Sequence, residues 1–213
     1  MKEPIPANPV EALASRIEHT LLRPEATRAD LEKLCGEARQ HRFHGVCIHG
    51  SRVIEACQLL QDSDLKVITV IGFPLGAVET DVKRFETEAA IDNGAHEVDV
   101  VINIGWLKEG NHRALLRELR DIVEAADDRI VKVILETSLL TRDEKVTACK
   151  LTQEAGAHFV KTSTGFGRAN GTVEDVRLLR ETVGPKFGIK ASGGIRDRQT
   201  ALAMIEADRK SVV

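Results

Sequence analysis

Short apolar segments rich in valine and isoleucine recur along the chain, separated by longer segments with apolar residues at helical spacing. The short segments predict seven strands, over residues 17–22, 46–49, 66–72, 97–102, 131–136, 159–163 and 187–192. The longer segments predict helices over residues 81–93, 112–126, 142–155, 173–183 and 198–207. Most of the strands are continuously apolar rather than alternating, which is typical of parallel strands buried on both faces.

The junctions between helices and strands share one pattern. A helix end is followed by a glycine-containing turn and then by a strand, and the turn glycines are Gly45, Gly94 and Gly156. Glycine is expected there because it adopts positive φ at a helix C-terminus without steric cost. The alternation of strand and helix predicts an α/β fold.

Seven strands with intervening helices favour a (β/α)8 TIM barrel that forms a single domain over residues 1–213. An open doubly wound sheet is the alternative. That fold would favour a GxGxxG turn after its first strand, and the GFPLGA segment at residues 72–77 is not that fingerprint.

Composition narrows the possible functions. The net charge is −3 and aromatic residues make up 3% of the chain, so we expect no nucleic-acid surface. No apolar run is long enough to cross a membrane, and the first residues lack a signal-peptide core, so we expect a cytoplasmic protein. The four cysteines are expected to be reduced, and Cys47 to be a packed thiol.

The histidines give no metal-binding pattern. All seven are scattered, without an HxxxH motif or a Cys/His cluster, so we expect no metal. His41 and His44 flank a turn, and we expect surface or packing roles for both.

Three charged residues interrupt the apolar strands. They are Asp99 in GAHEVDVVINIG, Lys161 in GAHFVKTSTG and Lys190 in KFGIKASGGI. Burying a charge is costly, and in a barrel alternate side chains of each strand face inward, toward a site at the C-terminal strand ends. These residues therefore predict a reactive site. Lys132 stands near the start of its strand, and we expect its head group to reach water along its apolar stem.

Two buried lysines and an aspartate indicate a particular chemistry. A lysine is protonated at neutral pH, but burial and a second nearby cation lower its pKa. A neutral lysine amine attacks carbonyl groups and forms a Schiff base, which permits a carbon–carbon bond to break or form next to the former carbonyl. The aspartate can move the protons that these steps require, and the reaction needs neither a metal nor another cofactor.

The sequence resembles the class I deoxyribose-phosphate aldolase family from about residue 17 to 207. The matching motifs include IEHTLLRPEAT (17–27), EVDVVINIGWLKEG (97–110), KVILETSLLT (132–141), FVKTSTGFG (159–167) and GIKASGGIR (188–196). The resemblance implies a barrel enzyme that interconverts 2-deoxy-D-ribose 5-phosphate with acetaldehyde and D-glyceraldehyde 3-phosphate. It assigns the Schiff base to Lys161, the pKa-lowering role to Lys190 and the proton relay to Asp99.

The same resemblance assigns a phosphate site to Thr164 and Gly165 after the sixth strand and to Gly193 and Gly194 after the seventh. Backbone N–H groups in such loops suit a phosphate dianion. The implied partners are a phosphorylated sugar and acetaldehyde, and we expect a homodimer.

The C-terminus departs from the pattern of the chain. After the helix end at 205–207 we expect a Gly-Ala turn and an eighth strand, but the chain reads ADRKSVV. An eighth unit truncated or altered in this way predicts weak phosphate binding and low stability. Two alternatives therefore remain open. One is a Schiff-base aldolase with another aldehyde donor, and the other is a barrel of the same family that is weakly active or inactive.

Overall fold

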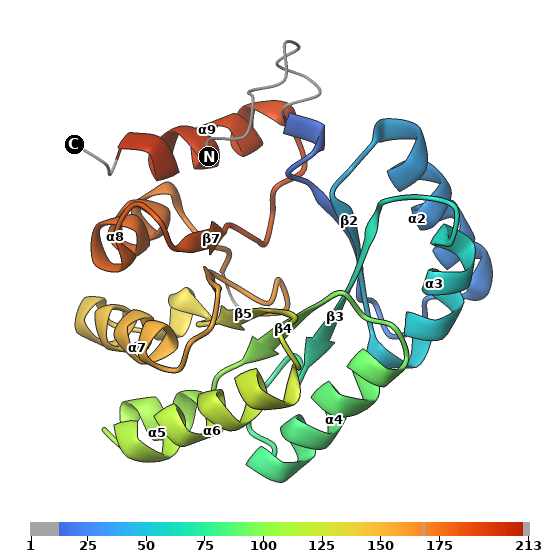
Figure 1. Ribbon diagram of the computed structural model, residues 1–213. Helices are drawn as coiled ribbons and strands as arrows, with labels where there is room; N and C mark the ends of the chain where they lie inside the picture. Colours follow the sequence, from blue (N-terminus) through green and yellow to red (C-terminus); the bar gives the residue numbers. More distant parts are fainter. Residues whose placement is uncertain (1–12, 168, 211–213) are drawn as a thin grey trace. The chain divides into compact units, whose positions relative to one another are not determined.

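The computed structural model describes residues 13–167 and 169–210 (Figure 1). All seven predicted strands are present, with ends within two residues of the predicted ones. They are β1 (Glu18–Leu21), β2 (Gly45–Ile48), β3 (Lys66–Ile71), β4 (Glu97–Val101), β5 (Ile130–Ile134), β6 (Phe159–Lys161) and β7 (Gly188–Lys190).

The five predicted helices are also confirmed. They are α4 (Thr80–Asp92), α6 (His112–Ala125), α7 (Arg142–Glu154), α8 (Val173–Val183) and α9 (Arg198–Lys210). The structure adds α2 (Arg28–His41), α3 (Val53–Leu60), α5 (Ile104–Lys108) and the 3₁₀ turns η1 (Gly50–Arg52) and η2 (Thr137–Leu139). Strands and helices alternate, so the predicted α/β class is confirmed. Among the described helices, none is both long and apolar enough to span a membrane.

The chain divides into two compact units. The first contains the described residues up to Val70 together with Ala89–Glu97, and the second contains Ile71–Glu88 and the chain from Val98 onward. In the first unit, β1, β2 and β3 are parallel neighbours, with Thr20 opposite Cys47 and Cys47 opposite Ile68. Cys47 is fully buried in β2, as predicted.

The second unit holds β4, β5, β6 and β7 in that order. Ile134 pairs with Lys161, and Lys161 pairs with Lys190, in parallel register. Val131, Val133 and Val160 are fully buried on these strands. Parallel strands place their C-terminal ends at one edge, so side chains and loops at these ends meet there.

The helices of the second unit begin at well-defined caps. Thr141 accepts a hydrogen bond from the N–H of Glu144 at the start of α7, and the Glu144 carboxylate accepts the N–H of Thr141 in return. Thr172 and Asp175 form the same capping box at the start of α8. Each box satisfies N–H groups that a helix N-terminus leaves without partners, which fixes where the strand-to-helix loops end.

The turn glycines follow the prediction at two of three positions. Gly94 and Gly156 have φ values of 100° and 84°. The prediction for Gly45 is wrong, because the left-handed residue after α2 is Arg42, with φ 53°, and Gly45 lies within β2. A Cβ at Gly45 would lie 2.1 Å from the carbonyl oxygen of Lys66. Glycine is needed there for the close approach of two strands.

The last described element is α9, which continues three residues past its predicted end to Lys210. The final residues of the ADRKSVV segment, from Ser211, lie outside the described residues. The altered eighth unit therefore stays a prediction.

Candidate active site

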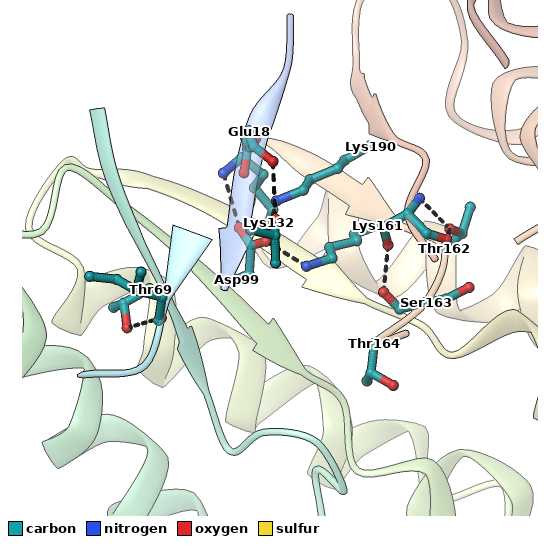
Figure 2. A network of polar contacts seen from close by, with 12 residues as sticks. Glu18, Thr69, Asp99, Lys132, Lys161, Thr162, Ser163, Thr164 and Lys190 are labelled. Atoms are coloured by element: carbon teal, nitrogen blue, oxygen red, sulfur yellow. Dashed lines mark hydrogen bonds and ion pairs between the residues drawn. The ribbon is translucent and has the colours of Figure 1, made fainter. Parts of the chain in front are cut away.

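Strands β4, β6 and β7 each bring one charged side chain to the same point (Figure 2). Asp99 is fully buried, and its Oδ2 lies 2.8 Å from Lys161 Nζ and 2.6 Å from Lys190 Nζ. Lys161 is itself only 3% exposed. The structure thus brings together the three charged residues that the sequence singled out, from three strands of one sheet.

A third lysine joins them, and here the sequence-based expectation is wrong. Lys132 is 2% exposed, and its Nζ donates to Asp99 Oδ1 at 2.9 Å instead of reaching water. Strand β5 begins at Ile130, so Lys132 is the third residue of the strand rather than an edge residue. The buried carboxylate supplies a counter-charge that the lysine would otherwise have to find in solvent.

One carboxylate therefore faces three ammonium groups. Burial alone raises the pKa of Asp99, but the positive charges of Lys132, Lys161 and Lys190 outweigh it and hold that pKa well below its usual range. Asp99 is consequently an ionised hydrogen-bond acceptor at neutral pH. The three ammonium groups lie close to one another around this carboxylate, and like charges at such short distances repel.

The loops that follow β6 and β7 are tied to each other. The hydroxyl of Thr162 donates to the Ser192 carbonyl at 3.2 Å and accepts the Ser192 N–H at 3.0 Å. The Ser192 hydroxyl donates to the Ser163 carbonyl at 2.5 Å. Among the buried side-chain nitrogen and oxygen atoms of the described residues, only Ser163 Oγ has no hydrogen-bond partner. These bonds fix the backbone directly after Lys161.

The predicted phosphate-binding glycines lie in these loops. Gly165, Gly193 and Gly194 have φ values of 82°, 85° and 72°. Gly165 and Gly193 are near neighbours, since a Cβ on Gly165 would lie 3.9 Å from the Cα of Gly193. Cβ atoms on Gly193 and Gly194 would lie 2.6 and 2.4 Å from the side-chain amide of Asn170. Only glycine fits this conformation and this spacing.

Thr164, the fourth residue predicted to bind phosphate, is hydrogen-bonded to a buried carboxylate. Its N–H and its hydroxyl both donate to Glu136 Oε2, at 3.2 and 2.5 Å. Glu136 follows β5 and is 3% exposed. Glu136 was missed by sequence reasoning, although it lies at the end of the predicted strand 131–136 and a charged residue in an apolar strand is the signal that revealed Asp99.

The first unit contains one group of possible metal ligands. Among the described residues, Glu18, His44 and Glu97 can bring ligand atoms within 4.8 Å of one another. His44 Nε2 lies 2.8 Å from Glu97 Oε1, so His44 is an ion-pair or hydrogen-bond partner rather than a simple packing residue. His41 does pack, with its ring stacked on Phe43.

Comparison with known proteins bears directly on this cluster. The sequence profile of the DeoC/LacD family aldolases matches residues 12–210. The chain belongs to this aldolase family. Its members include a deoxyribose-phosphate aldolase of Alkaliphilus oremlandii, 54% identical over 92% of this chain and 88% of its own length. Another, from Streptococcus suis, is 56% identical over 90% of this chain and 87% of its own length.

Solved structures agree with the family assignment. A structure titled as the unique tetrameric structure of deoxyribose phosphate aldolase from Aeropyrum pernix superimposes with a TM-score of 0.86. It is 36% identical, and the match covers 92% of this chain and 84% of that one. The strands that carry the lysine cluster thus belong to a family whose members catalyse aldol chemistry.

Proposed function

We propose that this chain is a class I deoxyribose-phosphate aldolase. It would cleave 2-deoxy-D-ribose 5-phosphate into acetaldehyde and D-glyceraldehyde 3-phosphate, and catalyse the reverse addition, through a Schiff base on Lys161. The observation that carries the proposal is the buried cluster in which Lys161 and Lys190 share Asp99 Oδ2.

The first half of the mechanism forms the iminium. Neutral Lys161 Nζ attacks C1 of the open-chain sugar and gives up one of its protons, and the C1 oxygen takes up two protons in all and leaves as water. Asp99 is ionised, so it accepts a proton, and the Lys190 ammonium is the donor that hydrogen-bonds the same oxygen of Asp99. Proton transfer along this pair supports both carbinolamine formation and its dehydration.

The second half breaks the C2–C3 bond. The C3 hydroxyl loses its proton, the electrons of the bond move into the iminium, and D-glyceraldehyde 3-phosphate leaves. The resulting enamine on Lys161 is protonated at C2, and water hydrolyses the new iminium to acetaldehyde and free lysine. No cofactor takes part, because the iminium is itself the electron sink.

The glycines of the two neighbouring loops are proposed to hold the phosphate. Backbone N–H groups at Gly165, Gly193 and Gly194 suit a dianion, and the positively charged lysine side chains attract it. We further propose that the strands belong to one (β/α)8 barrel domain acting in the cytoplasm. The match of this chain to barrel-type aldolase relatives over most of its length supports this.

We also propose a homodimer, with the second copy on the surface formed by Leu75, Val78, Val82 and Phe85. These side chains are 76%, 41%, 52% and 70% exposed within one segment, the loop after β3 and the first turns of α4. The exposed charges Asp81, Arg84 and Glu88 flank them on α4. Positive and negative side chains lie within two helical turns, so this surface is complementary to the same surface of a second copy. Light scattering should give twice the monomer mass, and Phe85→Glu should give the monomer.

The function is tested by release of D-glyceraldehyde 3-phosphate from 2-deoxy-D-ribose 5-phosphate, with Lys161→Arg as the control that keeps the charge. Wild-type protein should turn over, and the variant should lose at least about 10⁴-fold in kcat because arginine forms no Schiff base. Turnover only with other aldehyde donors would replace the substrate assignment. Full activity of Lys161→Arg would contradict the mechanism.

A further inference from the structure

Glu136 combines a backbone conformation that is unusual for a non-glycine residue with a buried carboxylate. Its backbone is left-handed, with φ 56° and ψ 63°, and its side chain is buried at 3% exposure. A residue with a Cβ is disfavoured in this conformation, and a buried carboxylate needs partners. The following residue holds this backbone segment in place, because the Thr137 N–H donates to the Thr162 carbonyl and the Thr137 hydroxyl donates to Asp175.

The carboxylate of Glu136 is directed into the loop after β6. Its Oε2 accepts both the N–H and the hydroxyl of Thr164, three residues after Lys161. The same carboxylate lies against Gly167, where an added Cβ would be 3.0 Å from Oε1. Glu136 is therefore enclosed by the segment from Thr164 to Gly167, which contains Gly165 of the proposed phosphate site.

The contact continues from Thr164 to the aromatic residues of the second unit. The Thr164 hydroxyl oxygen accepts the Phe166 N–H at 3.1 Å. The Phe166 ring is 53% exposed and meets Phe73 edge to face, with ring centroids 5.3 Å apart. Figure 2 shows Thr164 beyond Lys161 and Ser163 on the segment that leaves β6. One buried carboxylate thus fixes a loop that begins at the proposed Schiff-base lysine and reaches an aromatic pair.

We propose that Glu136 is a positioning residue that gives the enzyme its selectivity for a phosphorylated substrate. By holding both polar groups of Thr164, it removes them from the phosphate site and sets the direction of the Gly165 N–H toward Gly193. The phosphate is then bound by the glycine N–H groups and not by Thr164, whose N–H is already held by a carboxylate that would repel a dianion. This inference rests on the proposed aldolase function.

The test compares kcat and KM for 2-deoxy-D-ribose 5-phosphate and for unphosphorylated 2-deoxy-D-ribose. Glu136→Ala should raise KM for the phosphorylated substrate by about 10–100-fold, the usual effect of losing a residue that orients a binding group. The unphosphorylated sugar should be turned over almost as before, so the ratio of the two kcat/KM values should fall at least tenfold. Borohydride trapping of acetaldehyde on Lys161 should persist.

Two further variants separate positioning from a general loss of structure. Glu136→Gln keeps an oxygen that can accept both bonds from Thr164, so it should retain most of the phosphate selectivity. Thr164→Val removes the hydroxyl and keeps the side-chain shape, so it should lower the phosphate selectivity in the same direction as Glu136→Ala but by less. If Glu136→Ala does not fold, Thr164→Val is the variant that tests the proposal.

Unchanged selectivity in folded Glu136→Ala, or in Thr164→Val if the former is unfolded, would overturn the proposal. Wild-type protein without a trapped adduct or turnover would instead overturn the proposed function, so the two failures are distinguishable.

Discussion

Two buried clusters in the second unit combine lysine with a carboxylate, and they differ in stoichiometry. In one, Lys83 and Glu118 form a single pair with both side chains fully buried and 2.8 Å between Nζ and Oε1. In the other, Asp99 faces Lys132, Lys161 and Lys190. Both contact strand β4, since Lys83 also donates to the carbonyl of Val101. The surroundings are alike, so the difference in the number of lysines that contact the carboxylate is informative.

The balanced pair shows the signs of a structural interaction. Burial lowers the pKa of Lys83 and raises that of Glu118, and in each case it outweighs the attraction of the partner. Glu118 also accepts the hydroxyl of Thr80 at 3.3 Å. The Lys83 amine is held by the Glu118 carboxylate and the Val101 carbonyl and has no exposed surface, so it is not free to attack a carbonyl even though burial lowers its pKa.

The Asp99 cluster behaves in the opposite way. There the positive charges outweigh burial, and the pKa of Asp99 is held low rather than raised. Three ammonium groups around one carboxylate repel one another, and the loss of a proton from one of them relieves that repulsion. The comparison teaches that burial of a lysine does not by itself indicate catalysis, whereas several lysines gathered on one buried carboxylate do.

The largest predicted effect is a loss of aldolase turnover when the carboxylate of the Asp99 cluster is replaced, but not when Glu118 is replaced. Asp99→Asn should lower kcat by about 10²–10⁴-fold, the range for a lost acid–base group, because the amide cannot carry the proton. Steady-state cleavage of 2-deoxy-D-ribose 5-phosphate measures it. Glu118→Gln is the matched control, which should lower stability but leave the rate of the folded enzyme unchanged. An Asp99→Asn enzyme with near wild-type turnover would remove the distinction.

The second effect is on stability. Lys83→Met leaves the Glu118 charge buried without a partner and should lower the free energy of unfolding by about 3–5 kcal/mol. Removing both charges, in Lys83→Met with Glu118→Leu, should restore stability to within about 1 kcal/mol of wild type, since apolar side chains can replace a buried pair. Urea unfolding followed by circular dichroism gives both values, and a single variant as stable as wild type would show that the pair is not buried.

A smaller effect concerns Lys132. Lys132→Met removes the hydrogen bond to Asp99 Oδ1 and one positive charge, and should lower kcat about 10–100-fold, the usual result of losing a group that orients a reactive residue. Lys145→Met is the control, because Lys145 pairs with Asp175 instead. If the two variants have equal rates, Lys132 has only a structural role.

The smallest effect is a pH dependence of stability. The pKa of Asp99 is lower in the folded state than in the unfolded state, where it is about 3.9. The contribution of Asp99 to the stability of the fold is therefore fully present above about pH 3.9 and is lost as the pH falls through the folded-state pKa. The difference in melting temperature between wild type and Asp99→Asn should therefore stay constant from pH 7 to about 4 and shrink below that. A difference that already shrinks between pH 7 and 5 would mean that the pKa of Asp99 is raised instead.

The sequence predicted most of the fold and three members of the cluster for a clear physical reason. Apolar strands are visible by their valine and isoleucine content, and Asp99, Lys161 and Lys190 stand out against them. Lys132 was expected to reach solvent because a single sequence does not show at which residue a strand begins. It also does not show which buried carboxylate a lysine contacts. Lys83 and Glu118 lie in helical segments, where buried and exposed charges have the same pattern.

The loop contacts could not be predicted for a related reason. The bonds from Thr164 to Glu136 join residues 28 positions apart, and they depend on the left-handed backbone of Glu136. Non-glycine residues rarely adopt this conformation, so no pattern in ILETSLLT indicates it. Sequence reasoning therefore located the glycines of the proposed phosphate site but not Glu136, the carboxylate proposed to position their loop.

The most direct test of the central claim is reduction of the folded protein with borohydride in the presence of acetaldehyde, followed by peptide mapping. The Asp99 cluster predicts one reduced adduct, on Lys161, while Lys83, which is also buried, stays unmodified and serves as an internal control. An adduct on Lys83, or none on Lys161 in protein shown to be folded, would contradict the claim that the grouping of lysines around Asp99 creates the nucleophile.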